Sequence, residues 1–113
     1  MGMTFAKLKL SNLKDPKIKE DGNFLIDSGA HYTVVPKDMV SKLNLKPSWQ
    51  QDFELADGKI IKRNLGDCMI EYEDHRVPMQ VVLGENEDAA ILGVLTLEAM
   101  GLTLDPLARK IVL

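Results

Sequence analysis

Residues 24–30 read Phe-Leu-Ile-Asp-Ser-Gly-Ala, an apolar run that stops abruptly at an acidic residue. Three consecutive apolar residues are typical of a short buried strand. A carboxylate at the end of such a strand needs a partner, because an isolated ionised group is costly to remove from water. Gly29 permits a tight backbone and the close approach of another chain. Asp27 is therefore a candidate catalytic acid, and the open alternative is that its side-chain oxygen only caps a turn.

The residues after this loop predict a strand and a short helix. Tyr32–Val35 is rich in β-branched residues and ends at Pro36. Proline suits the first turn of a helix, where its missing N–H costs no hydrogen bond. Lys37–Leu43 then carries apolar residues at helical spacing, and we expect a helix there.

A β-hairpin is predicted in the middle of the chain. Asp57-Gly58 is a favoured two-residue turn with positive φ at both positions, and it lies between Phe53–Ala56 and Lys59–Lys62. Such a pair is more often a plain hairpin than a functional lid. Asn64–Asp67 is expected to form a further turn.

Other segments also predict strands, so the chain is mostly β with two short helices. Gly22 is expected to end the polar turn that follows the first strand, and Pro78 indicates a sheet edge or a bulge. Gly101 is expected to end a short helix over Thr96–Met100. The remaining predicted strands are Thr4–Leu10, Cys68–Tyr72, Arg76–Leu83, the apolar run Ala89–Leu92 before Gly93, and Leu102–Asp105 and Lys110–Leu113 around a turn at Pro106.

Composition limits the possible partners and compartment. The 113 residues carry a net charge of −3 and are 45% hydrophobic, which predicts one globular domain over residues 1–113. Mild acidity argues against nucleic acid as the main partner. No apolar run approaches the roughly 20 residues of a membrane helix. One cysteine, Cys68, forms no internal disulfide or zinc cluster, and we expect a cytoplasmic protein without a metal.

Three motifs in order resemble the retroviral-type, or retropepsin-like, aspartic proteases, and most of all their small prokaryotic and cellular members. Asp27-Ser28-Gly29-Ala30 resembles the family's Asp-Thr/Ser-Gly-Ala motif. Ile91-Leu92-Gly93 resembles its apolar-apolar-Gly motif, and the Phe53–Lys62 hairpin stands where the family has its flap. The resemblance implies an all-β subunit, a closed β-barrel with one or two short helices, that acts on peptide or protein substrates without a cofactor.

The resemblance also implies a homodimer, because family chains of this length carry one catalytic Asp each. Asp27 of both subunits would activate one water for hydrolysis of a peptide bond. Two carboxylates about 3 Å apart cannot both ionise comfortably, so they share one proton. Ser28 is implied to bond across the dyad into the partner's loop, and Gly29 and Ala30 to contact bound peptide. Ile91 is implied to form an apolar wall of the substrate groove, and the flap residues that cover the peptide are Ala56, Asp57, Gly58 and Lys59.

The sequence departs from the retroviral pattern at one pair of positions. His31 and Val94 stand where the family has an acid and an arginine that form an ion pair, so the contact between these loops must differ. Two alternatives remain open. One is a catalytically inactive, protease-like dimer that binds extended peptides by strand addition. The other is a small β-rich interaction domain without a groove. A serine-hydrolase site is disfavoured because no Gly-x-Ser-x-Gly motif is present.

Overall fold

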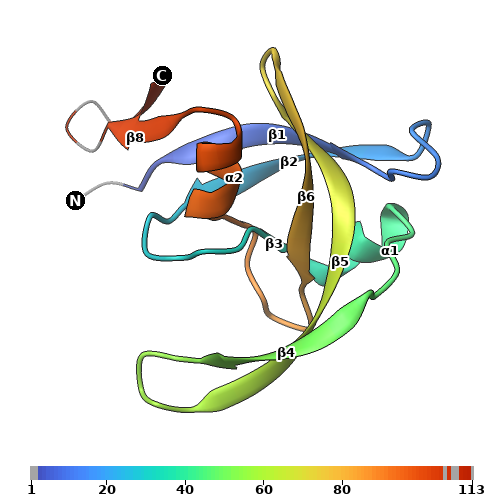
Figure 1. Ribbon diagram of the computed structural model, residues 1–113, viewed down its shortest axis with the longest axis vertical. Helices are drawn as coiled ribbons and strands as arrows, with labels where there is room; N and C mark the ends of the chain where they lie inside the picture. Colours follow the sequence, from blue (N-terminus) through green and yellow to red (C-terminus); the bar gives the residue numbers. More distant parts are fainter. Residues whose placement is uncertain (1–2, 106, 108–109, 113) are drawn as a thin grey trace.

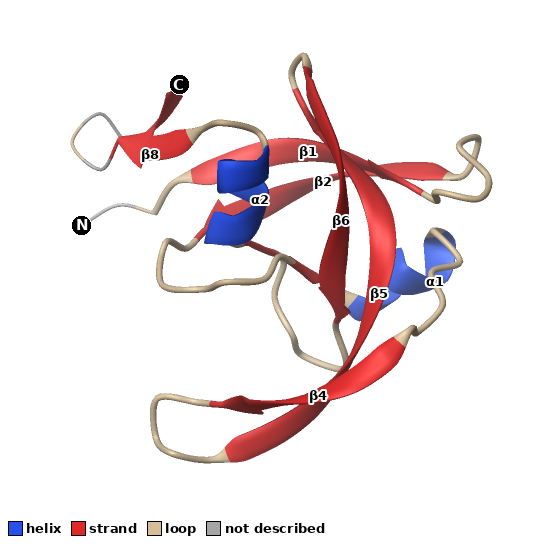
Figure 2. Cartoon of the chain, viewed as in Figure 1, coloured by secondary structure: helices blue, strands red, loops and turns tan. Residues whose placement is uncertain are grey.

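The main sheet closes on itself. The computed structural model describes residues 3–105, 107 and 110–112. The strand order is β1-β2-β7-β3-β6-β5-β4, and β1 also pairs with β5, so β4 lies outside the closed ring (Figure 1). The predicted fold, a closed β-barrel with two short helices, is confirmed (Figure 2). The elements are β1 (Phe5–Ser11), β2 (Lys19–Ile26), β3 (Val34–Val35), α1 (Lys37–Lys42), β4 (Trp49–Glu54), β5 (Ile60–Tyr72), β6 (His75–Leu83), β7 (Ile91–Leu92), α2 (Val94–Ala99), β8 (Thr103–Asp105) and β9 (Lys110–Val112).

Two parallel pairings place the functional loops side by side. β2 pairs with β7 at Ile26↔Leu92, and β3 pairs with β6 at Val34↔Val82. β7 also pairs with β3, in the antiparallel sense. Because β2 and β7 run in the same direction, the loop after β2 and the turn after β7 leave the barrel at the same end.

The turn predicted at Asn64–Asp67 is wrong, because these residues lie inside β5, a strand of 13 residues. Its ladder with β6 runs without interruption from Asn64↔Leu83 to Tyr72↔His75. A Cβ on Gly66 would lie 2.6 Å from the carbonyl oxygen of Lys46. A glycine is therefore needed at position 66 because another backbone packs closely against it. From the sequence alone, a turn would explain the glycine equally well.

Gly22 also lies inside a strand rather than at the end of a turn. It pairs with Leu8 across the β1–β2 ladder. A Cβ at this position would meet the Met39 Sδ at 3.1 Å. The turn itself comes earlier, where the Asn12 side-chain oxygen accepts hydrogen bonds from the backbone N–H groups of Lys14 (2.8 Å) and Asp15 (3.1 Å).

The expectation for Pro78 is confirmed. Pro78 pairs with Met69 of β5, whereas β3 pairs with β6 only at Val82 and Leu83. The other edge of β6 is therefore open at this position, and the missing N–H of the proline breaks no ladder bond.

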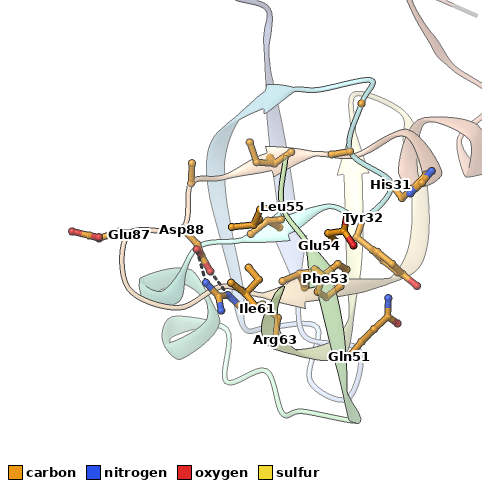
Figure 3. A pocket seen from close by; sticks show the side chains of 16 residues that line it. His31, Tyr32, Gln51, Phe53, Glu54, Leu55, Ile61, Arg63, Glu87 and Asp88 are labelled. Carbon is orange, nitrogen blue, oxygen red and sulfur yellow. Dashed lines mark hydrogen bonds and ion pairs between the residues drawn. The ribbon is translucent and has the colours of Figure 1, made fainter. Parts of the chain in front are cut away.

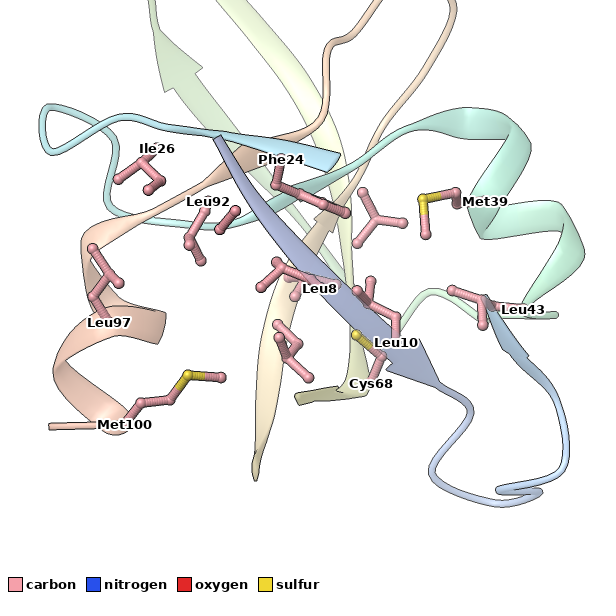
Figure 4. Packing of buried hydrophobic residues seen from close by; sticks show 14 of the residues in the cluster. Leu8, Leu10, Phe24, Ile26, Met39, Leu43, Cys68, Leu92, Leu97 and Met100 are labelled. Atoms are coloured by element: carbon pink, nitrogen blue, oxygen red, sulfur yellow. The ribbon is translucent and has the colours of Figure 1, made fainter. Parts of the chain in front are cut away.

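The barrel interior is filled by alternate residues of the strands (Figure 4). Leu8 and Leu10 of β1 are 1% and 0% exposed, and Phe24 of β2 is fully buried beside them. Cys68 of β5 lies in the same cluster as a free cysteine. Its burial raises the pKa of the thiol to about 12. The thiol thus stays protonated at neutral pH and packs as a small hydrophobic group.

The second helix ends as predicted but begins earlier. α2 starts at Val94, two residues before the expected Thr96, and Gly101 adopts a φ of 74° just beyond it. The N–H of Leu102 donates to the carbonyl of Leu97 (2.8 Å), and that of Gly101 donates to Glu98 (3.0 Å). These two bonds form a Schellman motif, which requires a residue with positive φ at Gly101.

The chain ends in a small hairpin of β8 and β9, paired from Thr103↔Val112 to Asp105↔Lys110. The turn predicted at Pro106 and the last predicted strand residue, Leu113, lie outside the described residues. No helix in the described ranges is long and apolar enough to cross a membrane.

Candidate active site

Asp27 is the first residue after β2 and is exposed. Its backbone N–H donates to the carbonyl of Leu92 (3.1 Å), which extends the pairing of β2 with β7 by one bond. Its side-chain Oδ1 accepts a hydrogen bond from the N–H of Gly29 (2.9 Å), and its carbonyl accepts one from Ala30 (3.1 Å). The predicted turn-capping bond thus exists, and it also fixes the direction of the carboxylate. The other oxygen, Oδ2, accepts no hydrogen bond from the described residues and is available to a ligand.

Gly93 joins the two loops at the same end of the barrel. A Cβ on Gly93 would lie 2.4 Å from the carbonyl carbon of Tyr32, so only glycine lets the two backbones approach this closely. The N–H of Val94 donates to the carbonyl of Ala30 (2.8 Å), and that of Leu95 donates to His31 (3.1 Å). At the two positions where the retroviral pattern has an ion pair, backbone hydrogen bonds therefore hold the loops together.

A buried pair of threonines reinforces this junction. The Oγ1 atoms of Thr33 and Thr96 lie 2.7 Å apart, and both residues are almost fully buried. Thr33 Oγ1 also accepts a hydrogen bond from the N–H of Gly93 (3.1 Å). This contact could not be predicted from the sequence, because the two threonines are 63 positions apart and each occurs in an ordinary local context.

A groove of about 550 Å³ opens beside the loop that follows Asp27 (Figure 3). Its walls come from that loop, from β4 and β5, and from the segment before β7. The ring of Tyr32 meets that of Phe53 edge-on, with centroids 5.8 Å apart, and ties the loop to β4. The groove is lined mainly by apolar side chains, among them Val34, Phe53, Leu55, Ile61, Val82 and Ile91. Such a lining suits the apolar side chains of an extended peptide.

The structure brings some of the predicted site residues together and separates others. Gly29, Ala30 and Ile91 line the groove together. Ser28 lines a second cavity of about 280 Å³, on a side of the loop that faces α2 and β8. The hairpin tip, Ala56–Lys59, does not line either of these cavities.

The hairpin turn differs from the predicted two-residue type. The N–H of Gly58 donates to the carbonyl of Leu55 (2.9 Å), and the N–H of Leu55 donates to Lys59 (2.8 Å). Gly58 has a φ of 86°, whereas Asp57 is not among the residues with positive φ. Three residues therefore form the loop, as a type I turn followed by a left-handed glycine. Asp57 accepts a hydrogen bond from the N–H of Lys59 (2.9 Å) and so stabilises the turn.

An ion pair closes one end of the groove. Arg63 Nε donates to Asp88 Oδ2 (2.7 Å) and Nη2 donates to Oδ1 (3.1 Å), which is a bidentate arrangement. The hydrogen bond from Arg63 lowers the pKa of Asp88, and the N–H of Glu85 adds to the effect. In the other direction, the bond to Asp88 raises the pKa of Arg63. The sequence held no signal for this pair, since its members are 25 positions apart.

The depressed pKa of Asp88 predicts how stability depends on pH. A carboxyl with a lower pKa in the folded than in the unfolded chain adds stability that is complete above its unfolded pKa, about 3.9 for aspartate. That stability is lost as the pH falls through the folded pKa. Urea unfolding between pH 7 and pH 3 should therefore show a lower free energy of unfolding for Asp88→Asn than for the wild type at pH 7, and this difference should shrink towards pH 3.

The matched control is Asp67→Asn, which removes an exposed carboxyl from β5, the strand that carries Arg63. Asp67→Asn should follow the wild-type pH dependence. A deficit of constant size for Asp88→Asn across this pH range would contradict the assignment of the depressed pKa to the ion pair.

Comparisons with known proteins agree with this geometry. The fold is similar to that of EIAV protease in complex with the inhibitor HBY-793, with a TM-score of 0.69 at 15% identity, over 92% of this chain and 93% of that chain. The sequence matches the family described as aspartyl protease over residues 12–96. The chain therefore belongs to the aspartyl protease family and has the retropepsin-like fold. It is an aspartic-type endopeptidase, as the three motifs predicted. No curated protein matches the sequence.

Within the described ranges, no group of three or more His, Cys, Asp or Glu side chains is arranged to hold a metal ion. The two histidines and Cys68 do not form a ligand set. His75 Nε2 lies instead 3.5 Å from Asp74 Oδ1.

Proposed function

We propose that this chain, acting as one protease domain, hydrolyses peptide bonds as a homodimer in which Asp27 of each subunit contributes one carboxyl group to the catalytic pair. The observation that carries the proposal is the exposed Asp27 carboxylate of a chain of this family, whose Oδ1 accepts a hydrogen bond from Gly29. Asp27 itself does not line the apolar groove, but Gly29 and Ala30 of its loop do. Each chain supplies only one Asp-Ser-Gly sequence. A two-carboxylate site therefore needs a second copy.

The chemistry follows from two carboxyl groups that share one proton. The ionised Asp27 accepts a proton from a water, and the oxygen of that water attacks the carbonyl carbon of the peptide bond. The protonated Asp27 of the partner subunit donates a hydrogen bond to the carbonyl oxygen and polarises it. As the carbon–nitrogen bond breaks, the amine takes a proton from the dyad. The two proton affinities belong to the pair and not to either residue.

Other loop residues position the dyad and the peptide. Ser28 is exposed and unbonded among the described residues, so its hydroxyl is free to reach the partner's loop. Gly29 and Ala30 offer backbone groups at the groove, and Ile91 supplies an apolar wall. An extended peptide in the groove would lie between these residues and β4.

The β4–β5 hairpin serves as a flap in this proposal. Ala56, Asp57, Gly58 and Lys59 form its tip and would cover the bound peptide, excluding water and adding backbone hydrogen bonds. The left-handed Gly58 and the Asp57 side-chain bond give the tip a defined turn. Leu55 and Ile60 next to the tip are exposed, at 42% and 53%. A covered substrate would bury this apolar surface.

Dilution tests the shared site. If the catalytic pair is split between chains, activity per chain should fall when the protein is diluted below the dimer dissociation constant. At a total concentration tenfold below that constant, roughly one-seventh of the chains are dimeric, and specific activity should fall accordingly. Cleavage of a mixed peptide library, read by mass spectrometry, gives the activity, and sedimentation gives the dimer fraction. Full specific activity in a monomeric sample would refute the homodimeric site, and binding of peptides without cleavage would favour the inactive module.

A further inference from the structure

The β4–β5 hairpin projects from the barrel as an arm with a defined root. The ladder between β5 and β6 ends at Asn64↔Leu83, whereas the ladder between β4 and β5 continues to Glu54↔Ile60. Residues Gln51–Arg63 therefore pair only with each other, and we call this segment the arm (Figure 1). Arg63 is the first residue of β5 beyond the barrel. A side-chain contact at this position sets the angle at which the arm leaves the sheet.

Arg63 occupies an inward-facing position of β5. Leu65, two residues along the strand, is fully buried, and Ile61 on the other side lines the groove. Side chains at alternate positions share one face of a strand, so the guanidinium points into the groove wall. Its side chain is only 18% exposed. A charge in such a place needs a partner, and Asp88 provides one by accepting both hydrogen bonds from the guanidinium.

Asp88 belongs to the loop between β6 and β7, which forms the opposite wall. Its Oδ2 also accepts a hydrogen bond from the N–H of Glu85 (2.8 Å), and its own N–H donates to the Glu85 carbonyl (3.0 Å). The carboxylate thus fixes the loop internally while it holds the arm. The same loop also places Glu85 Oε2 3.8 Å from Arg63 Nη1, and its Asn86 Oδ1 accepts a hydrogen bond from Lys37 Nζ (3.2 Å) at an exposed position.

Besides the contacts of Arg63 with Asp88 and Glu85, the described residues include an aromatic contact between the arm and the body across the groove. Phe53 meets Tyr32 edge-on, nearer the tip of the arm. Figure 3 shows that this ring pair and the Arg63–Asp88 pair lie on different sides of the groove. The ring contact is apolar and tolerates sliding, whereas the bidentate pair allows one geometry. The ion pair is therefore the more restrictive of the two.

We propose that Arg63 and Asp88 are positioning residues that clamp the root of the arm against the β6–β7 loop and thereby set the width of the substrate groove. This proposal rests on the proposed function in one respect only, namely that the groove binds the substrate. A chain without the clamp would sample arm angles that do not fit a peptide. The apparent affinity for the peptide is reduced in proportion to the fraction of chains in the fitting state, so KM rises. The bound complex reacts as before, so kcat does not change.

Kinetics on a peptide that the wild-type protein cleaves in a mixed library test this role. Arg63→Met should raise KM about tenfold, as expected if roughly one chain in ten holds the arm in place, with kcat changed by less than about twofold. Asp88→Asn should also raise KM, because it removes the charge that holds Arg63 while keeping an oxygen that accepts the Glu85 N–H. If the two residues act through their pair, the double variant Arg63→Met with Asp88→Asn should raise KM no further than Arg63→Met alone. A direct contact between Arg63 and the peptide would instead make the two effects multiply.

Lys62→Met is the matched control, since Lys62 is the exposed neighbour of Arg63 and points to the other face of β5. It should leave KM unchanged. An Arg63→Met variant with unchanged KM would overturn the proposal, as would a fall in kcat without a change in KM, or effects of Arg63→Met and Asp88→Asn on KM that multiply in the double variant.

Arm position is measurable without any substrate. Nitroxide labels at Ile60→Cys on the arm and Lys19→Cys on β2 report one distance, since buried Cys68 does not react. The labelled protein is mixed with an excess of unlabelled chains, so that most dimers hold at most one labelled subunit and the measured distance lies within that subunit. Double electron–electron resonance should give a narrow distribution for the wild type and the Lys62→Met control, and a broad one for Arg63→Met. Identical distributions would refute the clamp. If the wild type cleaves no peptide, the proposed function fails while this measurement still decides the clamp.

Discussion

Asp27→Asn is expected to reduce peptide cleavage by about 10³-fold or more. General acid–base steps supplied by one positioned group contribute roughly 10²–10⁴-fold, and both such steps depend on the carboxyl pair. An asparagine has the same shape, and its side-chain oxygen still accepts the hydrogen bond from Gly29 that now holds Asp27. Its amide cannot accept a proton from water at any working pH. The measurement is kcat/KM on a peptide that the wild-type protein cleaves.

The matched control is Asp21→Asn on the same strand. Asp21 is exposed on β2, where it pairs with Lys9 of β1, and it lies outside the groove. This variant should keep full activity and wild-type stability. Asp27→Asn should also unfold at the wild-type urea concentration, because an exposed carboxyl at a strand end contributes little to folding. Wild-type cleavage by a folded Asp27→Asn protein would end the assignment of Asp27 as the catalytic acid.

Mixing the two chains extends this test to the dimer. When wild-type chains exchange with a roughly ninefold excess of Asp27→Asn chains, about one wild-type chain in ten pairs with another wild-type chain. Activity per wild-type chain should therefore fall to about one-tenth. Undiminished activity after subunit exchange would mean that one Asp27 suffices.

The sequence predicted those features of the site that are local. A buried strand that ends in Asp27, and a glycine two positions later, are both visible within residues 24–30. Gly93 was likewise found by its place after an apolar run. Local signals also placed Gly101 correctly, since a left-handed helix end needs nothing beyond the helix itself. Asp27, Gly29 and Gly101 act through the backbone of their own neighbourhood, whereas the backbone that Gly93 meets, at Tyr32, is 61 positions away in sequence.

Features that depend on distant contacts could not be found in this way. The Arg63–Asp88 pair and the Thr33–Thr96 pair each join segments that only the closed barrel brings together. The same reason explains the wrong turn at Asn64–Asp67. Gly66 is a glycine because the backbone of Lys46 passes over it, and that backbone is 20 positions away in sequence. A glycine alone does not distinguish a turn from a close approach.

Among the glycines that the structure describes, Gly93 is the one at which an added methyl group is expected to destabilise the fold most. The new Cβ would lie 2.4 Å from the carbonyl carbon of Tyr32 and 2.6 Å from the carbonyl oxygen of His31. Both obstacles are backbone atoms, so no side-chain rotation relieves the contact. Overpacking of a buried site costs typically 1–3 kcal/mol, and we expect about 3 kcal/mol here. The change in the free energy of unfolding is measured with urea.

The variant should lose activity beyond its loss of stability. Moving the backbone of residues 31–32 away from Gly93 strains the hydrogen bond from Val94 to Ala30 (2.8 Å), and the N–H of Ala30 in turn bonds to the Asp27 carbonyl. Activity normalised to the folded fraction should therefore also fall. Gly22→Ala is the control, since its Cβ would meet only side-chain atoms, Met39 Sδ and Phe24 Cε1, both at 3.1 Å, which need to move by no more than a few tenths of an ångström. If Gly93→Ala were no more destabilising than Gly22→Ala, the close backbone contact would not be what holds the two loops together.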